Sequence, residues 1–589
     1  MEGLPMQNVA ECLVSDLEKR GVSHIFGLCG HTNIAVLAAL EHSSIRFIST
    51  THEQIAAHMA DGYARSSHQV GVVLTHVGPG LTNAATAVAT AALDSTPLLV
   101  LSGDIPSHFY GKNPHQEINL HHDASQHEIF RPFVKRTWRV EKPEQLPAIL
   151  SKAYQLAQSG KPGPVLISVP MDIFSAPMSE DLFATHHTPG LPPAKPSLST
   201  STAQEILTTL KAAKKPLLFA GGGVIAAQAT NELKALAEHL NIPVVHSAMG
   251  KGSLPDDHPL SAGLTGFWAP PFVNAMCLEA DVIFALGTRF KEADSSSWKE
   301  GVTFDFSKTK LIQIDIDSQE LGRNHPVHIG AVADMKESLK QIVELANNQP
   351  SEFDHSHREI TFIAHEKERF YEENTEHLMS NDFPMRPQRI LAEVRHCLPK
   401  DGFITTDVGW NKNGVGQQFP IYTPGTVLTP GGFATMGFGS PAALGIKIAH
   451  PERVVVSLVG DGGFGQNPSC LATAVQENIP IIWIVMNNQS YGVIAGLQKA
   501  HFNTTHGTMF EKNGEPYSPD FVALANSYGV EGCKIQSAED FKPALAEAIA
   551  KQVPFLIDVA TMNIPTPTSG HWDIMDIYSP GEKKSHSAL

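Results

Sequence analysis

The sequence predicts an α/β protein with three doubly wound parallel-sheet domains. Short apolar runs alternate with helical patterns along most of the 589 residues, and this alternation is typical of parallel sheets covered by helices on both faces. Two polar stretches, near 185–202 and 347–359, interrupt it. Because the chain is longer than one hydrophobic core organises, we expect domains at 1–185, 195–345 and 380–565, and an aperiodic tail at 566–589.

The composition excludes several classes of protein. The 43 basic and 60 acidic residues give a net charge of −17, which repels phosphate backbones and anionic lipids, so we expect no nucleic-acid and no membrane partner. The longest apolar runs are less than half of the roughly 18 residues that a membrane helix needs. The N-terminus has acids in an amphipathic helical pattern and does not resemble a signal peptide. The six scattered cysteines are typical of reduced thiols, and we expect a cytoplasmic protein.

In the first segment, three candidate residues follow strand-like runs. Glu53 comes after RFISTTH and opens a helical pattern, so its side chain is expected at a strand end. His31, in LCGHTN, and His76, in LTHVGPG, lie in other turns between a strand-like run and a helix. An imidazole in such a turn can bind a carboxylate or relay a proton, but a single histidine is commonly structural, and both readings stay open.

The middle segment contains a glycine triplet, Gly221, Gly222 and Gly223, where KPLLFAGGGV passes from a strand to a helix. Such a turn lets a backbone approach phosphates, although alone it is weak evidence. Later apolar runs end near Arg289, Asp315 and Asp334.

The third segment carries the strongest chemical pattern. RVVVSLVGDGGFG and PIIWIVMNNQS are two buried-strand patterns whose polar ends, Asp461 and Asn488, are 27 residues apart. One strand-helix-strand crossover takes about 25 to 30 residues, so both side chains should reach the same sheet edge. With the backbone carbonyl of Ser490 they would form an oxygen site suited to Mg²⁺ and phosphate oxygens. The glycines of this turn, at 460, 462 and 463, would let a diphosphate approach.

These motifs together resemble those of the thiamine-diphosphate-dependent decarboxylases and carboligases. GDG followed by NN resembles the diphosphate motif, THEQIAAHMADGYAR the cofactor-activating glutamate motif, and GGFATMGFGSPAALG the segment that cradles the thiazolium. The chain looks most like the acetohydroxyacid synthase group, with features of benzaldehyde lyase and cyclohexane-1,2-dione hydrolase. The resemblance implies a pyrimidine-binding domain, a middle domain and a diphosphate-binding domain, in that order.

The resemblance also implies roles for particular residues. Glu53 would exchange a proton with the pyrimidine ring of thiamine diphosphate, and Met436 would hold the cofactor bent. Gly409 and Asn411, in DVGWNKNG, would contact the diphosphate with Gly460, Asp461, Gly462, Gly463 and Asn488. In this family the glutamate and the diphosphate motif of one site belong to different subunits, which implies a homodimer or homotetramer.

For the middle domain the resemblance implies FAD. The residues that match the FAD contacts of acetohydroxyacid synthases are Gly221, Gly222, Gly223, Arg289, Asp315 and Asp334. The chain has RFKEAD where that group typically has RFDDR. A domain that holds another nucleotide, or none, is the alternative.

The substrate side departs further from the acetohydroxyacid synthases. Val493 and Leu497, in GVIAGLQ, replace a methionine and a tryptophan, which predicts a roomier apolar pocket. The glutamine that many relatives place here falls on His121 or His122 when counted back without gaps from RPFVK. We expect a decarboxylating carboligase for pyruvate or a similar 2-oxo acid, with a relaxed acceptor site. A lyase or hydrolase of diones or 2-hydroxy ketones is the alternative, and a non-catalytic nucleotide-binding assembly protein is a minor one.

Overall fold

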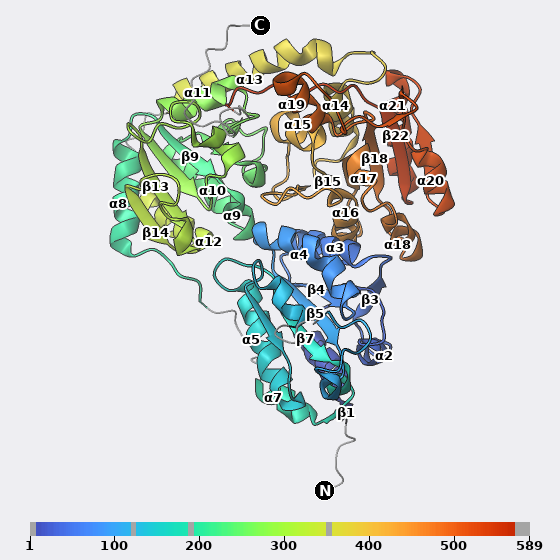
Figure 1. Cartoon of the computed structure of the whole chain (residues 1–589). Helices are drawn as coiled ribbons and strands as arrows, with labels where there is room; N and C mark the ends of the chain where they lie inside the picture. Colours follow the sequence, from blue (N-terminus) through green and yellow to red (C-terminus); the bar gives the residue numbers. More distant parts are fainter. Residues whose placement is uncertain (1–6, 119–124, 187–193, 349–355, 572–589) are drawn as a thin grey trace.

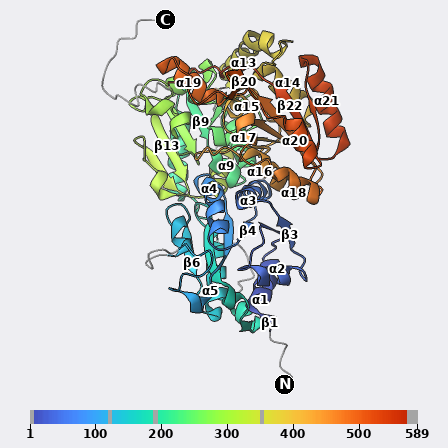
Figure 2. The same ribbon diagram turned by 45° about the vertical axis from the view of Figure 1, so that its right-hand side comes forward.

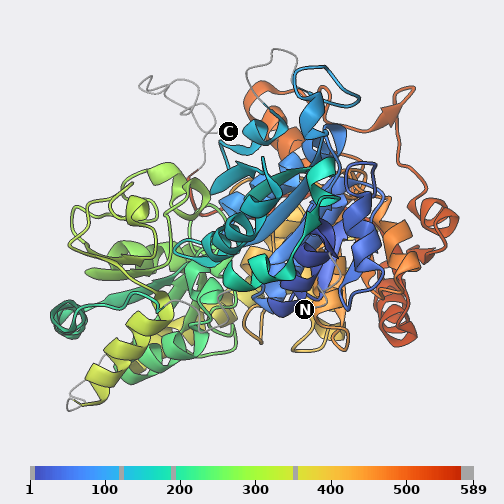
Figure 3. The same cartoon turned by 90° about the horizontal axis from the view of Figure 1, so that it is seen from below.

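The computed structural model describes residues 7–118, 125–186, 194–348 and 356–571. It contains three six-stranded parallel sheets, each flanked by helices, so the predicted α/β class is confirmed. Figure 1 shows the first domain beneath the other two, which lie side by side. Seen from below, the first domain lies in front of the third, with the middle domain to one side (Figure 3).

The first domain has the strand order β3-β2-β4-β5-β7-β6. Its central strands are buried along their whole length, which explains why GVVLT and LLVLSGD have no polar alternation. The strands are β2 (His24–Gly27), β3 (Arg46–Ser49), β4 (Gly71–Thr75), β5 (Leu98–Asp104), β6 (Arg136–Arg139) and β7 (Val165–Pro170). The helices are α1 (Val9–Lys19), α2 (Ile34–Leu40), α3 (Glu53–Ser67), α4 (Pro79–Leu93), α5 (Leu146–Gln158), α6 (Met171–Phe174) and α7 (Glu180–His186), and β1 (Gln7–Asn8) pairs with β8 (Pro177–Met178).

The middle domain has a different strand order, β11-β10-β9-β12-β13-β14, which in chain order reads 3-2-1-4-5-6. This is the order of dinucleotide-binding sheets. Its strands are β9 (Pro216–Ala220), β10 (Val244–His246), β11 (Ser261–Leu264), β12 (Val282–Leu286), β13 (Lys310–Asp315) and β14 (Ile329–Val332). Its helices are α8 (Thr200–Ala212), α9 (Gly222–Ala226), α10 (Thr230–Leu240), α11 (Pro271–Glu279) and α12 (Met335–Asn347).

The third domain repeats the topology of the first, with the order β16-β15-β17-β18-β22-β21. Its strands are β15 (Phe403–Thr406), β16 (Val427–Leu428), β17 (Val455–Gly460), β18 (Ile482–Asn487), β21 (Glu531–Lys534) and β22 (Phe555–Ala560), with a hairpin of β19 (Glu511–Lys512) and β20 (Glu515–Pro516). Its helices are α14 (Pro387–Cys397), α15 (Trp410–Gln418), α16 (Gly439–Ala449), α17 (Asp461–Phe464), α18 (Cys470–Gln476), α19 (Gly492–Phe502), α20 (Phe521–Ser527) and α21 (Ala538–Lys551). The charged helix α13 (Ser356–Leu378) precedes this domain.

One hydrophobic core joins the first and third domains. Helices α3 and α4 bury their apolar faces in the same cluster as α16 and α18, and Figures 1 and 2 show these helices at the junction of the two domains. A Cβ added to Gly62 of α3 would strike the backbone of Ala442, and one added to Gly445 of α16 would strike the backbone of Met59. Glycines at these positions therefore allow the two helix backbones to pack closely.

The described part of the tail lies on the middle domain. The Thr568 hydroxyl donates to the carbonyl oxygen of Phe267, and the Ser569 hydroxyl donates to that of Ala269 at 2.6 Å. The rest of the predicted tail, 572–589, lies outside the described residues. Among the described residues, no helix combines the length and the hydropathy that a membrane span requires.

Candidate active site

Several of the candidate residues lie where the strand order of each sheet reverses. This happens between β2 and β4 in the first domain, between β9 and β12 in the middle domain, and between β15 and β17 in the third. In open α/β sheets, ligands bind outside the carboxyl ends of the strands at this switch point. His31 follows β2 and His76 follows β4, while Gly409 follows β15 and Asp461 follows β17.

Asp461 and Asn488 lie at the same edge of the third sheet. Their strands, β17 and β18, are neighbours with Gly460 opposite Met486. The Asp461 carboxylate is only 4% exposed and accepts N–H bonds from Gly462 at 2.9 Å and from Gln489 at 2.6 Å. The second bond ties the loop after β18 to the end of β17, as the spacing of the two motifs predicts.

The electrostatics of this site suit a cation. Burial raises the pKa of Asp461 to about 6 because the desolvation of the carboxylate outweighs the backbone hydrogen bonds that it accepts. The nearby Ser490 hydroxyl is buried without a hydrogen-bond partner. The described residues contain no cluster of three or more His, Cys, Asp or Glu side chains fit for a metal. A carboxylate with amide and carbonyl oxygens instead fits a hard ion such as Mg²⁺.

Asn563 is a residue of this site that the sequence did not reveal. Its Oδ1 atom accepts the Trp410 indole N–H at 2.9 Å and an amide N–H of Asn488 at 3.4 Å. These bonds orient the Asn488 amide, whose Oδ1 atom accepts the backbone N–H of Ser490. Asn563 follows β22, a strand with no recognised motif, so only the sheet order brings it here.

The glycines of the third domain leave space at the site. A Cβ on Gly462 would lie 2.8 Å from the Tyr491 ring and 3.2 Å from the Met436 Cε atom. Gly409 has a φ of +121°, which a side chain would strain. Backbone can therefore approach a ligand between Met436 and the end of β17.

The Met436 turn is held by Asp407, another residue that sequence reasoning passed over. This fully buried carboxylate accepts the backbone N–H groups of Val408, Gly437 and Gly439. Its position, an acid directly after the strand FITT, could have suggested a role. The Asn411 side chain serves the same turn, because its Oδ1 atom accepts the Asp407 N–H at 3.0 Å.

Glu53 is buried at the start of α3, with 4% of its surface exposed. Its Oε2 atom accepts an amide N–H of Asn83 at 3.0 Å. A Cβ on Gly80 would lie 3.1 Å from Oε1 of Glu53 and 2.9 Å from Cβ of His76. Glu53 and His76 therefore flank the first turn of α4 together.

His76 is fixed by hydrogen bonds on both ring nitrogens. Its Nε2 atom lies 2.7 Å from Gln116 Oε1, and its Nδ1 atom lies 2.9 Å from the Thr32 hydroxyl. Because an amide oxygen only accepts, we assign the proton to Nε2, and Nδ1 then accepts from Thr32. A Cβ on Gly30 would collide with this ring.

His31 lies in a group of three imidazoles. Its ring centre is 4.6 Å from that of His76 and 6.0 Å from that of His115. The pKa of His31 is lowered mainly by partial burial and, to a smaller extent, by the neighbouring His76 and His115. The ring is therefore neutral at pH 7 and can donate or accept a hydrogen bond.

Gln116 and His115 are site residues that the sequence analysis missed. The ungapped count led instead to His121 and His122, which lie outside the described residues. The sequence contains a glutamine nearby, in HQE at 115–117, but an ungapped count back from RPFVK does not reach it. Only the contact with His76 places Gln116 at this site.

Val493 and Leu497 lie one turn apart on α19, directly after the Asn488–Ser490 loop. Both are partly buried. A spacing of four residues puts them on one face of the helix, so the two predicted pocket residues form a common apolar surface.

In the middle domain, the predicted residues follow β9, β12, β13 and β14 along one sheet edge. Burial raises the pKa of Asp315, at the end of β13, to about 6. Two other side chains have partners within the protein. Arg289 donates to the carbonyl oxygen of Leu93 at 2.6 Å, and Asp334 caps α12 and pairs with Lys195 at 3.1 Å.

Comparison with known proteins decides the family. Three profiles match in succession: the N-terminal thiamine pyrophosphate binding domain at residues 7–126, the central domain at 203–342 and the C-terminal thiamine pyrophosphate binding domain at 407–559. The chain belongs to the thiamine pyrophosphate enzymes. The order of the three profiles agrees with that of the three sheets.

The relatives place the chain more narrowly within the thiamine pyrophosphate enzymes. It is 35% identical over 563 residues to a probable acetolactate synthase large subunit of Methanococcus aeolicus, covering 94% of this chain and 92% of the relative. A protein of the same description from Methanocaldococcus jannaschii is 36% identical, with 93% and 91% covered. Acetolactate synthase isozyme 3 large subunit of Escherichia coli is 33% identical, with 93% of each chain covered. The chain is a thiamine-pyrophosphate-dependent enzyme similar to acetolactate synthases.

Proposed function

We propose that this enzyme is a Mg²⁺-dependent decarboxylating carboligase that acts on pyruvate or a similar 2-oxo acid and has a relaxed acceptor site. The observation that supports the relaxed acceptor site is the apolar face of α19, where Val493 and Leu497 follow the Asn488–Ser490 loop. A face without large polar or aromatic side chains favours apolar acceptors of varied size. The acetolactate synthase names of the relatives support the donor.

The chain's own residues supply proton transfer and orientation. Thiamine diphosphate supplies a nucleophilic carbon and an electron sink. Glu53 would exchange a proton with the pyrimidine ring through Oε1, since Oε2 is held by Asn83. Asp461, Asn488 and the Ser490 carbonyl would hold Mg²⁺ and the diphosphate. His31 would donate its proton to a substrate oxygen, and His76, whose Nε2 proton is donated to Gln116, would orient the Gln116 amide at the site.

We further propose that two subunits share each site, in a homodimer or homotetramer. Within the chain, the contacts of α3 with α16 fall beyond Glu53: the His58 ring meets Phe438, and the His450 Nε2 atom donates to the Ser66 carbonyl oxygen. Among the described residues, no hydrogen bond joins Glu53 to the third domain. Ile34 follows the His31 turn and Phe433 precedes the Met436 turn, and their side chains, 58% and 43% exposed, would be covered by the partner subunit.

For the middle domain we propose FAD as a structural group. The 3-2-1-4-5-6 strand order and the Gly221–Gly223 turn at its switch point support a dinucleotide. The desolvated Asp315 carboxylate after β13 would accept hydrogen bonds from a ribose. Absorbance of the purified protein near 450 nm, a flavin property, tests this assignment, and a colourless protein would contradict it.

The test of the main proposal uses purified enzyme with thiamine diphosphate, Mg²⁺ and pyruvate. We expect release of carbon dioxide and formation of acetolactate, and faster product formation when an aromatic aldehyde is added as acceptor. A Leu497→Trp variant should lose the aromatic acceptor while it keeps acetolactate formation. Absence of both carbon dioxide and acetolactate would contradict the carboligase assignment.

The His31, His76 and His115 group favours a second candidate, the cleavage of diones or 2-hydroxy ketones. Three adjacent rings can hold a water molecule or the second oxygen of a dione. In this case a cyclic 1,2-dione would be consumed without carbon dioxide release, and His31→Ala would abolish that activity.

A further inference from the structure

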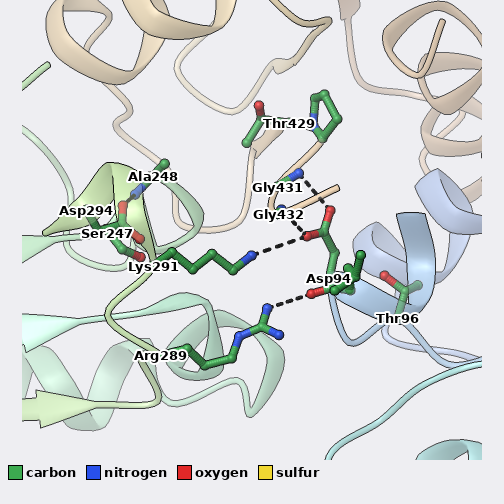
Figure 4. A network of polar contacts seen from close by, with 12 residues as sticks. Asp94, Thr96, Ser247, Ala248, Arg289, Lys291, Asp294, Thr429, Gly431 and Gly432 are labelled. Atoms are coloured by element: carbon green, nitrogen blue, oxygen red, sulfur yellow. Dashed lines mark hydrogen bonds and ion pairs between the residues drawn. The ribbon is translucent and has the colours of Figure 1, made fainter. Parts of the chain in front are cut away.

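The buried carboxylate of Asp94 ties all three domains together at one point. Asp94 follows α4 in the first domain, and its side chain is inaccessible to solvent. Its Oδ2 atom accepts the backbone N–H of Gly431 at 2.7 Å, and Oδ1 accepts that of Gly432 at 2.9 Å. Figure 4 shows the carboxylate facing these two glycines, with the Lys291 side chain of the middle domain pointing toward it next to Gly432.

Positive charges compensate the burial of this carboxylate. Arg65 Nη2 lies 2.9 Å from Oδ2, and Lys291 Nζ lies 3.8 Å from Oδ1. Burial alone would raise the pKa of Asp94, but Arg65, Lys291 and the two backbone N–H groups outweigh it and lower the pKa. The carboxylate therefore stays charged and keeps both bonds to the third domain.

The segment from Thr429 to Gly432 is held on its carbonyl side as well. Arg65 donates to the carbonyl oxygen of Thr429 at 2.9 Å, and the buried Lys412 ammonium donates to that of Pro430 at 2.5 Å. A Cβ on Gly432 would collide with Lys291 Nζ, and one on Gly431 would collide with Asp94 Oδ1, so a side chain at either position would displace one of these charged groups.

The Met436 turn starts directly after this segment. Phe433, Ala434 and Thr435 separate Gly432 from Met436, and beyond Met436 the Asp407 carboxylate holds Gly437 and Gly439. Buried carboxylates therefore bind the backbone on both sides of this turn: Asp94 of the first domain before it and Asp407 of the third domain after it. Its position depends on both ends.

We propose that Asp94 is a positioning residue that sets where Met436 meets the thiamine cofactor. This inference rests on the proposed cofactor role of Met436. Asp94 does not touch the site, and it acts through the Gly431 and Gly432 backbone. The first domain of each chain thereby positions the cofactor cradle of its own third domain, while its Glu53 serves another site.

The test compares Asp94→Asn with Asp61→Asn. Asp61 is also buried and pairs with the same Arg65, at 2.6 Å, but it accepts no hydrogen bond from Gly431 or Gly432, so Asp61→Asn separates the effect of a disturbed Arg65 from that of the lost glycine bonds. For Asp94→Asn we expect faster hydrogen exchange in the peptide 429–437 of the cofactor-free protein. We also expect a thiamine diphosphate dissociation constant raised about tenfold, because bonds to a charged acceptor are lost, and a lower kcat with little change in KM. For Asp61→Asn we expect exchange of this peptide and cofactor affinity within about twofold of wild type.

The readouts separate this inference from the proposed function. If hydrogen exchange in the peptide 429–437 is unchanged in Asp94→Asn, Asp94 does not hold this segment, whatever reaction the enzyme catalyses. Faster exchange with unchanged cofactor affinity overturns the positioning role, as does an equal loss of affinity in Asp61→Asn. A wild-type protein that binds no thiamine diphosphate overturns both proposals. If Asp94→Asn does not fold, Lys291→Met replaces it in the test. We then expect a smaller effect in the same direction, and the absence of any effect would overturn the proposal.

Discussion

At the residue scale, the buried carboxylate of Asp461 lowers the stability of the folded protein at neutral pH. Its pKa is raised to about 6 in the metal-free protein, so the folded state binds this proton more tightly than the unfolded chain does. The contribution of Asp461 to stability therefore becomes less favourable as the pH rises from about 4 to about 6, and is constant above that.

Replacing Asp461 with Asn should stabilise the metal-free protein at pH 8. We expect a gain of about 1 to 2 kcal/mol in the free energy of unfolding, shrinking as the pH falls toward 5, because a neutral amide avoids the desolvation cost. Urea unfolding in EDTA at both pH values measures this. The variant should also lose the stabilisation that Mg²⁺ and thiamine diphosphate confer on wild type.

Asp407 provides the contrast to Asp461. It is also buried, but three backbone N–H groups satisfy its carboxylate. Burial raises the pKa of Asp407 as well, so its contribution to stability falls as the pH rises, and Asp407→Asn should destabilise the protein more at pH 5 than at pH 8. Stabilisation by this variant, or a loss of stability in Asp461→Asn at pH 8, would contradict this account of the two sites.

Glu53→Gln should lower kcat by a factor of roughly 10² or more, as expected when a positioned proton-transfer group is lost. The amide keeps the size of the side chain and can still accept from Asn83 through its oxygen, so the fold and thiamine diphosphate affinity should change little. Steady-state kinetics and cofactor titration measure the two effects. Unaltered activity on every carbonyl substrate tested would remove Glu53 from the mechanism.

The sequence predicted those site residues that follow a strand with a recognisable spacing. Asp461 and Asn488 are an example, because the length of one crossover is enough to place them together. It missed Asn563, Gln116 and Asp94, whose partners are 75, 40 and 337 residues away along the chain. Contacts at such separations depend on sheet order and domain packing, which local pattern does not encode.

At the scale of elements, the packing of α3 against α16 joins the first and third domains. Both helices are rich in small residues, which the sequence shows, but their pairing across nearly 400 residues is visible only in the fold. Close contact between the helices requires Gly62 and Gly445.

Gly62→Ala should destabilise the protein by about 2 kcal/mol or more, because the added methyl group meets the Ala442 backbone and forces the helices apart. Thermal unfolding measures the loss. Gly496→Ala is the matched control, since Gly496 is also within a helix and its Cβ would meet only Trp410, at 3.9 Å. The control should gain about 0.5 to 1 kcal/mol through helix propensity, and an equal loss in both variants would contradict the close-packing argument.

At the scale of the whole molecule, the residues that we assign to the cofactor site lie in different domains of one chain. The first domain carries Glu53, and the third carries Asp461 and Met436. Within one chain, α3 and α16 meet at His58 and beyond. Under our proposal, a complete site takes Glu53 from one subunit and Asp461 from another.

A mixture of two inactive variants tests this arrangement. In a hybrid of Glu53→Gln and Asp461→Asn subunits, one site combines the intact Glu53 of one subunit with the intact Asp461 of the other, and the second site carries both substitutions. Random exchange makes about half of the dimers hybrids, so about a quarter of wild-type activity should return. If both residues of a site came from the same subunit, every site in the mixture would carry one substitution and no activity would return. The double variant Glu53→Gln/Asp461→Asn, mixed with Glu53→Gln, should stay inactive because no site then receives an intact Glu53.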